Sequence, residues 1–387
     1  MKHARADVLA RADRVLSDLS FGYVSEWLEA GEGRHAIGYL PMYVPREVIA
    51  AAGMLPVAIF GAGDALDIVK GDAYFQSYIC HIPRSVIEMA LDGRFDAFSG
   101  FLFPSICDVI RNLSGMWKMN FPRHYVKYLD FPQNFDPEVG GAFYRREIEE
   151  VMENLARLSG RRIAGADLHA AIVLYNQNRR LVERLYDARR DAPHDHPTSE
   201  VYRVARAGAV LSVDDHSRLV QDYLDAAAAE PLPEQDRIRV YLIGAFCEQP
   251  PMGLLRTLEQ AGCDLVGDDL LLGLRYLRGD VRTDGDPVQA LVDAYLTQAT
   301  WSSAVYDGDR PKEDRMMEDV RASRADGVVF CCPSFCDPAL LDRPMLQRRL
   351  EKEGVPFASF QYAENTGQFQ VIREQAGTFS DSIKLWE

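Results

Sequence analysis

The stretch Pro104-Ser105-Ile106-Cys107-Asp108 recurs later in the chain as Pro333-Ser334-Phe335-Cys336-Asp337. Each copy follows an apolar run that predicts a buried strand, and each is followed by apolar residues at helical spacing. Both cysteines are therefore expected in a turn from a strand to a helix, beside the unpaired N–H groups at the helix start. In the second copy we expect Asp337 to be the N-cap and Pro338 the first helical residue. Such a position stabilises a thiolate and suits an anionic group. A single cysteine would be interpreted as a small buried residue, but the repeat favours a function.

The segments around the two copies predict the same order of elements. In the first half we expect strands at 36–40, 55–60, 98–103 and 125–129 and a helix at 46–52. In the second half we expect strands at 238–243, from 264, at 327–331 and at 357–360, and a helix at 252–261. Strand–helix–strand units of this kind predict parallel sheets. The last strand of each half leads to a loop with an asparagine, Asn134 or Asn365.

The fold class is therefore predicted to be α/β, with two topologically similar domains whose parallel sheets are flanked by helices. The expected parts are a helical N-terminal segment over 1–35, a first α/β domain over 36–142, a helical connector over 143–236 and a second α/β domain over 237–387. Ligands bind such open sheets beyond the carboxyl ends of the strands. If the two domains face each other, Cys107 and Cys336 converge across the cleft between them.

Composition and charge exclude several classes of protein. Of the 387 residues, 47% are hydrophobic and 26% charged, as in ordinary soluble proteins. The net charge of -15 argues against nucleic-acid binding. The longest apolar run, 49–63, is broken by Gly53 and Pro56 and is too short to span a membrane. The start of the sequence is charged rather than apolar, so we expect no signal peptide and a cytoplasmic protein.

A third cysteine has the same local setting. Cys80 precedes a predicted helix with Pro83 in its first turn. Three thiolates at helix starts, Cys80, Cys107 and Cys336, suit a zinc ion with His81 as fourth ligand, or a [4Fe–4S] cluster with one iron left open. The spacing does not choose between these sites and three structural thiols. The total of seven cysteines is odd, which favours thiols and metal ligands over disulfides.

The remaining candidates have simpler interpretations. His81 is a candidate proton donor, with a hydrogen-bonded structural histidine as the alternative. The other cysteines are interpreted as structural: Cys247, Cys263, Cys331 and Cys332. The G-x-G-x-x-A at 31–36 precedes its strand, the wrong context for a nucleotide-binding loop, and the P-loop lysine motif is absent from the sequence. Any ATP chemistry must therefore belong to a partner.

The motifs carry a family resemblance. FPSICDVIR at 103–111 and FCDP at 335–338 resemble the 2-hydroxyacyl-CoA dehydratase/benzoyl-CoA reductase family. The closing segment, with FQYAEN at 360–365, GQFQ at 367–370 and REQAG at 373–377, is similar to the smaller cluster-bearing subunit of the reductase branch. It departs from the dehydratase form of this tail, in which an arginine and Glu-Ala-Phe follow the Gly-Gln. The resemblance therefore favours a reductase over a dehydratase.

The resemblance implies a cofactor and partners. Cys80, Cys107 and Cys336 would each bind one iron of a [4Fe–4S] cluster, with the fourth iron left to water or substrate. The expected partners are a homologous larger cluster-bearing subunit and ATP-hydrolysing activator subunits with their own [4Fe–4S] cluster, with ferredoxin as the electron donor.

The implied reaction is the ATP-driven, two-electron dearomatising reduction of benzoyl-CoA, or a related aromatic CoA thioester, to a cyclohexadiene-carbonyl-CoA. The thioester carbonyl would carry the first electron as a ketyl radical anion. The first alternative is an (R)-2-hydroxyacyl-CoA dehydratase subunit, which removes water by radical syn-elimination. The second alternative is a non-catalytic metal-binding scaffold.

Overall fold

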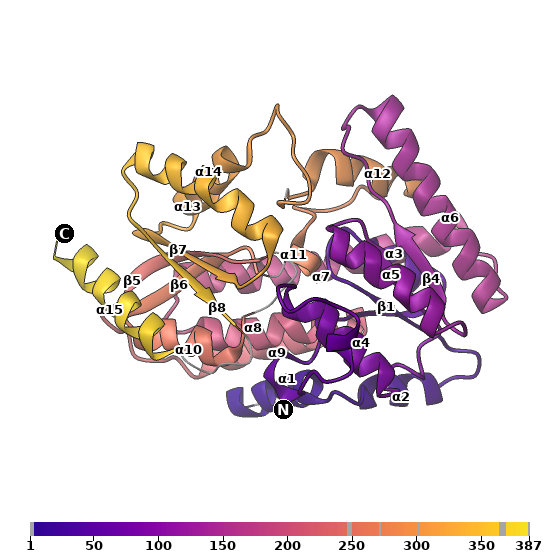
Figure 1. Ribbon diagram of the computed structural model, residues 1–387, viewed down its shortest axis with the longest axis horizontal. Coiled ribbons are helices and arrows are strands. Elements are labelled where there is room, and N and C mark those ends of the chain that lie inside the picture. Colours follow the sequence, from indigo (N-terminus) through magenta and orange to yellow (C-terminus); the bar gives the residue numbers. More distant parts are fainter. Residues whose placement is uncertain (1–3, 246–249, 271, 301, 364–368, 386–387) are drawn as a thin grey trace.

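The chain forms two four-stranded parallel sheets of identical strand order (Figure 1). The computed structural model describes residues 4–245, 250–270, 272–300, 302–363 and 369–385. The sheets have the orders β2-β1-β3-β4 and β6-β5-β7-β8, and every pairing is parallel. The first consists of β1 (Ala36–Tyr39), β2 (Leu55–Ala58), β3 (Gly100–Pro104) and β4 (Tyr125–Leu129). The second consists of β5 (Ile238–Ile243), β6 (Cys263–Asp268), β7 (Gly327–Pro333) and β8 (Phe357–Tyr362). The predicted fold class is confirmed.

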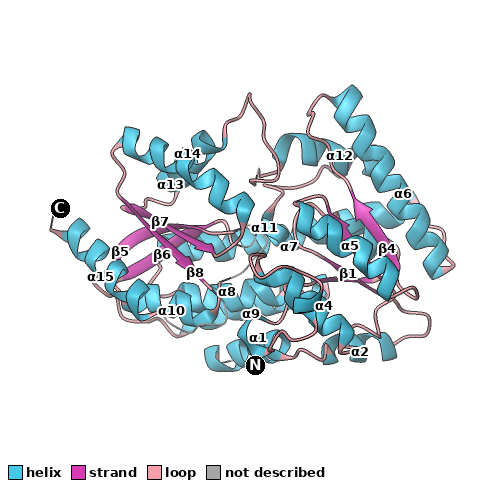
Figure 2. Cartoon of the chain, viewed as in Figure 1, coloured by secondary structure: helices cyan, strands magenta, loops and turns pink. Residues whose placement is uncertain are grey.

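Helices lie around both sheets (Figure 2). The first sheet is connected by α3 (Arg46–Ala51), α4 (His81–Leu91) and α5 (Asp108–Asn120). The second sheet is accompanied by α10 (Met252–Gln260), α14 (Asp337–Glu353) and α15 (Gln370–Lys384). Gly53 and Gly262 follow α3 and α10 at positive φ, 74° and 88°, a backbone conformation that glycine adopts without strain. The βαβ pattern of the sequence is thus built twice.

A helical connector links the sheets and joins their cores. It consists of α6 (Ala142–Ser159), α7 (Gly165–Asp191), α8 (Thr198–Ala207) and α9 (Val213–Ala229), preceded by a π-helical turn at Pro137–Gly141. The N-terminal half of α7 buries Leu168 and Ile172 in the first core, and its C-terminal half buries Val182 and Leu185 in the second. Helix α9 lies within the segment that the sequence predicts to be a helical connector, and Ser212 caps it by accepting a hydrogen bond from the Asp215 N–H at 3.2 Å.

The N-terminal helices also serve both cores. Helix α1 (Arg5–Ser17) packs against α8 and α9 and buries Val8 and Ala12 in the second core. Helix α2 (Gly22–Glu29) buries Val24 in the first. None of the described helices is long and apolar enough to cross a membrane.

The segment between β6 and β7 contains elements that the sequence did not predict. These are α11 (Leu272–Arg275), α12 (Pro287–Gln298) and α13 (Lys312–Ala322). Helix α12 packs against α6 and α7 and adds Leu291, Val292 and Tyr295 to the core of the first sheet. Although it follows β6 in the sequence, α12 is therefore part of the packing of the other half.

Candidate functional site

Each of the three candidate cysteines is the residue immediately before a helix. Cys80 is the N-cap of α4, Cys107 of α5 and Cys336 of α14. The Cys107 carbonyl accepts a hydrogen bond from the Arg111 N–H at 3.2 Å, and the Cys336 carbonyl from the Leu340 N–H at 3.0 Å. The predicted position of all three at helix starts is confirmed.

The two repeated turns have matching backbone contacts. After β3, the Ser105 N–H donates to the Leu129 carbonyl at the end of β4, at 2.9 Å. After β7, the Ser334 N–H donates to the Tyr362 carbonyl at the end of β8, at 2.8 Å. In both turns the serine of the repeat therefore fixes the chain to the neighbouring strand before the cysteine is reached.

One detail of these turns differs from the prediction. Asp337 was expected to cap α14, with Pro338 at the first helical position; instead Cys336 is the N-cap and Asp337 is the first helical residue. Asp108 has the same place in α5. Both acids are exposed, and they contribute a favourable first-turn charge rather than a cap.

The structure brings the three cysteines to one region between the two halves. Cys107 and Cys336 are close enough for the charge of one thiolate to disfavour ionisation of the other. Cys80 packs against a small buried cluster that contains Cys332 and Cys336. Three cysteines that are remote along the sequence thus lie in one region beyond the carboxyl ends of the two sheets.

Burial dominates the electrostatics at Cys107. It raises the pKa of the Cys107 thiol, and hydrogen bonds from the backbone N–H groups of Ile110 and Val109 only partly oppose this effect. The expected thiolate-stabilising contribution of the helix start is therefore present but outweighed. A bound cation would reverse the balance, because metal coordination deprotonates a thiol.

The turn before Cys336 is strained. Phe335 has a φ of 67°, in the left-handed region that is unfavourable for an aromatic side chain, and 51% of its surface is exposed. Strained backbone of this kind is concentrated at functional sites. Phe335 is the residue directly before the buried Cys336, which is 3% exposed.

The donor set is compatible with a metal–sulfur centre. Within the described ranges, no group of three or more His, Cys, Asp or Glu side chains has the arrangement of a ready-made metal site. Whether a metal centre fits here therefore depends on the chemistry of the available donor atoms. These are the thiol sulfurs, since the side chains of Asp108 and Asp337 are exposed to solvent. Soft sulfur donors select iron–sulfur clusters or zinc over hard cations. The ligand role of Cys80, Cys107 and Cys336 remains a prediction.

The other sequence candidates lie as follows. His81 is the first residue of α4 and is half-buried next to Cys80. Cys331 and Cys332 are buried in β7, and Cys263 in β6. Burial raises the pKa of Cys332 and of Cys263 to about 12, so both stay neutral thiols. Cys247 and Asn365 lie outside the described residues.

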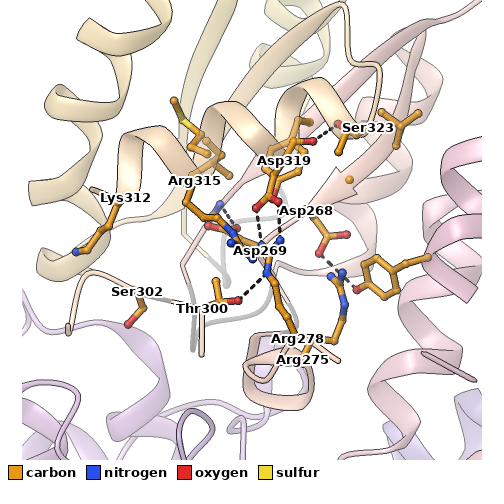
Figure 3. Close-up of a pocket in the computed structure, with 18 of the residues that line it drawn as sticks. Asp268, Asp269, Arg275, Arg278, Thr300, Ser302, Lys312, Arg315, Asp319 and Ser323 are labelled. Carbon is orange, nitrogen blue, oxygen red and sulfur yellow. Dashed lines mark hydrogen bonds and ion pairs between the residues drawn. The ribbon is translucent and has the colours of Figure 1, made fainter. Parts of the chain in front are cut away.

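Sequence reasoning missed a pocket beside the cysteines. It has a volume of about 350 Å³ and lies at the carboxyl ends of β5 and β6, against α7, α13 and α14 (Figure 3). Ala339 of α14 lines this pocket and also belongs to the cluster of Cys332 and Cys336. The only local signal for it was the pair Asp268-Asp269 directly after a predicted strand.

Asp269 connects the pocket to the cysteine region. Its carboxylate accepts a hydrogen bond from the Gly244 N–H at 2.7 Å, and the Gly244 carbonyl lies 4.0 Å from the Cys332 sulfur. Burial raises the pKa of Asp269 to about 8, and the negative charge of Asp268 acts in the same direction. Asp269 is therefore mainly protonated at neutral pH.

These features define a class: two-domain α/β proteins whose like halves meet at cysteines held at helix starts. Comparison with known proteins identifies the family within that class. The sequence model of the 2-hydroxyglutaryl-CoA dehydratase D-component family matches residues 41–383, so the chain belongs to that family.

Individual relatives cover nearly the whole chain. The chain is 51% identical over 382 residues to a benzoyl-CoA reductase subunit of Thauera aromatica, covering 98% of this chain and 99% of the relative. It is 27% identical to the (R)-phenyllactyl-CoA dehydratase beta subunit of Clostridium sporogenes, covering 93% and 95%. It is 28% identical to the beta subunit of lactoyl-CoA dehydratase of Anaerotignum propionicum, covering 92% and 93%.

Proposed function

We propose that this chain is the smaller cluster-bearing subunit of a benzoyl-CoA reductase, an oxidoreductase that dearomatises benzoyl-CoA or a related aromatic CoA thioester. The observation that carries this proposal is the 51% identity to a benzoyl-CoA reductase subunit over 98% of the chain. The dehydratase subunits share only 27–28%. The closing segment of the sequence, which favours the reductase branch, supports the same choice.

The proposed cofactor is a [4Fe–4S] cluster held by Cys80, Cys107 and Cys336. Its support is the position of all three cysteines at helix starts and the electrostatic effect of Cys336 on the Cys107 thiol. When bound, the cluster supplies single electrons at low potential. The backbone N–H groups of Val109 and Ile110 would donate hydrogen bonds to the Cys107 sulfur, which favours added negative charge on it.

Residues around the cysteines are proposed to keep water away from them and to supply a proton. The small residues Ala245 and Ala339 pack with Cys336 and exclude water from it, which strengthens the electrostatic interactions there. His81, beside Cys80, is the proposed proton donor, because each electron added to an aromatic ring must be followed by a proton.

The proposed partners supply functions for which this sequence has no motif. The sequence has no P-loop motif, so ATP hydrolysis is assigned to separate activator subunits with their own [4Fe–4S] cluster, and reduced ferredoxin is the proposed electron donor. A homologous larger subunit would cover the exposed Phe335 and Leu341, which are 51% and 78% exposed beside the Cys336 turn. We place the assembly in the cytoplasm, where thiol ligands stay reduced.

An anaerobic assay of the assembled enzyme tests the function. The chain is purified with its larger subunit and activator and given benzoyl-CoA, ATP and a low-potential donor. We expect loss of the aromatic thioester, with ATP hydrolysed in proportion to turnover. The rival function is 2-hydroxyacyl-CoA dehydration, for which the family model and the dehydratase relatives are the favouring observations. Formation of an enoyl-CoA from a 2-hydroxyacyl-CoA, without stoichiometric reductant, would replace the proposal by that rival.

A further inference from the structure

The pocket beside the cysteine region has an unbalanced positive charge. Most of its charged groups are neutralised by ion pairs. Arg278 donates to both carboxylate oxygens of Asp319, at 2.7 and 2.6 Å. Lys312 pairs with Asp342 at 2.9 Å. These four groups therefore contribute no net charge to the pocket.

The other charged groups of the wall are also paired or balanced. Asp187 is paired with Arg190 at 2.6 Å, and Arg179 with Glu47 at 2.5 Å. Asp268 is paired with the buried Arg189 at 2.5 Å. Asp269 is mainly neutral near pH 7, because burial raises its pKa to about 8. Arg275, which lies over the Tyr186 ring, and Glu183 bring one charge of each sign.

Arg315 is the exception. Its Nε is buried and has no hydrogen-bond partner among the described residues. Its carboxylate contact is Glu318 at 3.6 Å, and the Glu318 side chain is 67% exposed, so solvent weakens that pair. Burial and the neighbouring Arg278 both lower the pKa of Arg315. Asp319 is paired with Arg278, and its charge acts on Arg315 only through space. Figure 3 shows the side chains of the two arginines pointing toward each other from opposite sides of the pocket.

The rest of the wall is largely apolar. Tyr241, Ile243, Leu277, Met316 and Leu346 line the same cavity. Apolar walls with a few convergent polar groups are the usual composition of small-molecule sites. The volume of about 350 Å³ exceeds the share of roughly 30 Å³ that one water takes in the liquid by about tenfold, so the space suits an organic molecule.

We infer that this pocket binds a small organic carboxylate, with its charged group on Arg315 and Arg278 and its apolar body against the side chains of Ile243, Met316 and Leu346. A single uncompensated positive charge matches a monoanion. The planar guanidinium groups match a carboxylate in geometry. Inorganic phosphate has no apolar part to fill the cavity. The inference does not depend on the reaction proposed above.

Titration of the purified chain with 4-fluorobenzoate near pH 7, followed by ¹⁹F NMR, tests the inference. We expect saturable binding to the parent protein. Arg315→Gln removes the charge but no buried ion pair, and it should weaken binding by about tenfold or more. Arg315→Lys, which keeps the charge, should lose less. The matched control is Arg321→Gln on the same helix, whose side chain pairs with Glu353 away from the pocket and which should bind like the parent.

Three results would overturn the inference. The first is the absence of saturable binding to the parent. The second is equal affinity of the parent and Arg315→Gln. The third is tighter binding of inorganic phosphate than of 4-fluorobenzoate in a competition experiment, which would show that the apolar wall does not select the ligand. Circular dichroism of each variant is recorded first. If Arg315→Gln is unfolded, the affinities of Arg315→Lys and Arg315→Met for 4-fluorobenzoate are compared instead. Tighter binding by Arg315→Lys supports the inference, and equal binding overturns it.

Discussion

Cys107 and Cys336 occupy the same position in the two halves of the molecule. Each is the last residue before the helix that follows the third strand of its sheet. The two thiols are near enough to influence each other's ionisation. A repeated strand–turn–helix unit has therefore brought one cysteine of each half into the same region, and the proposed electron chemistry depends on that relationship.

The first prediction concerns the pH dependence contributed by Asp269. Its pKa is raised from 3.8 to about 8 in the folded protein, so the folded state holds a proton that the unfolded state releases above about pH 4. Stability contributed by this group therefore decreases as pH rises from about 4 to about 8 and is constant above that. Asp269→Asn keeps the acceptor for the Gly244 N–H and removes the titration. We expect the melting temperature of the variant minus that of the parent to be larger at pH 8 than at pH 5.

Thermal melts of both proteins across this range check the prediction. Only the difference between variant and parent is compared, because other groups titrate in both proteins alike. A difference that is independent of pH would mean that Asp269 is ionised throughout, and the charge balance assigned to the pocket would then be wrong.

The second prediction concerns the buried ion pair of Arg189 and Asp268, whose side chains are 1% and 2% exposed. Arg189→Met leaves the Asp268 charge without its partner and should lower the free energy of unfolding by about 3–5 kcal/mol. The exposed pair of Arg321 and Glu353 is the control, and Arg321→Met should lower it by only about 0–1 kcal/mol. Urea unfolding curves give both values; equal small effects would contradict the structural importance given to the buried pair.

The third prediction concerns the strained, exposed Phe335. Phe335→Asn removes the ring but keeps a residue that tolerates positive φ, so we expect little change in the stability of the isolated subunit. If the ring contacts the larger subunit, the variant should associate with it more weakly, as measured by analytical ultracentrifugation. Met119→Asn, which changes an 84% exposed side chain on α5, is the control. Unchanged association of Phe335→Asn would remove this turn from the proposed interface.

Much of the fold could be predicted because its signals are local. The predicted strands at 125–129 and 238–243 coincide with β4 and β5, since each is a short run of strand-forming residues between clear breaks. The cysteine turns were predicted for the same reason, because the repeat includes the strand end, the turn and the helix start. The cap of α14 was displaced by one residue, within the usual uncertainty of a helix boundary.

What was missed depends on contacts between distant residues. Helix α12 is stabilised by burying Leu291 and Tyr295 in the core of the other half, which no local pattern reveals, although Asp286-Pro287 was a recognisable helix start. The pocket likewise forms only when Arg278, Arg315 and Asp319 are brought to the ends of β5 and β6. The charge balance of the pocket depends on how deeply each group, such as Asp269, is buried. That burial cannot be deduced from the sequence.

Iron and acid-labile sulfide analysis of anaerobically purified protein tests the central claim most directly. The account predicts about four irons and four sulfides for each parent chain, loss of both in Cys107→Ala and in Cys336→Ala, and retention in Cys332→Ala, whose cysteine is buried next to Cys336 but is not an assigned ligand. Full iron and sulfide content in Cys107→Ala or Cys336→Ala, or stoichiometric zinc without iron in the parent, would contradict it.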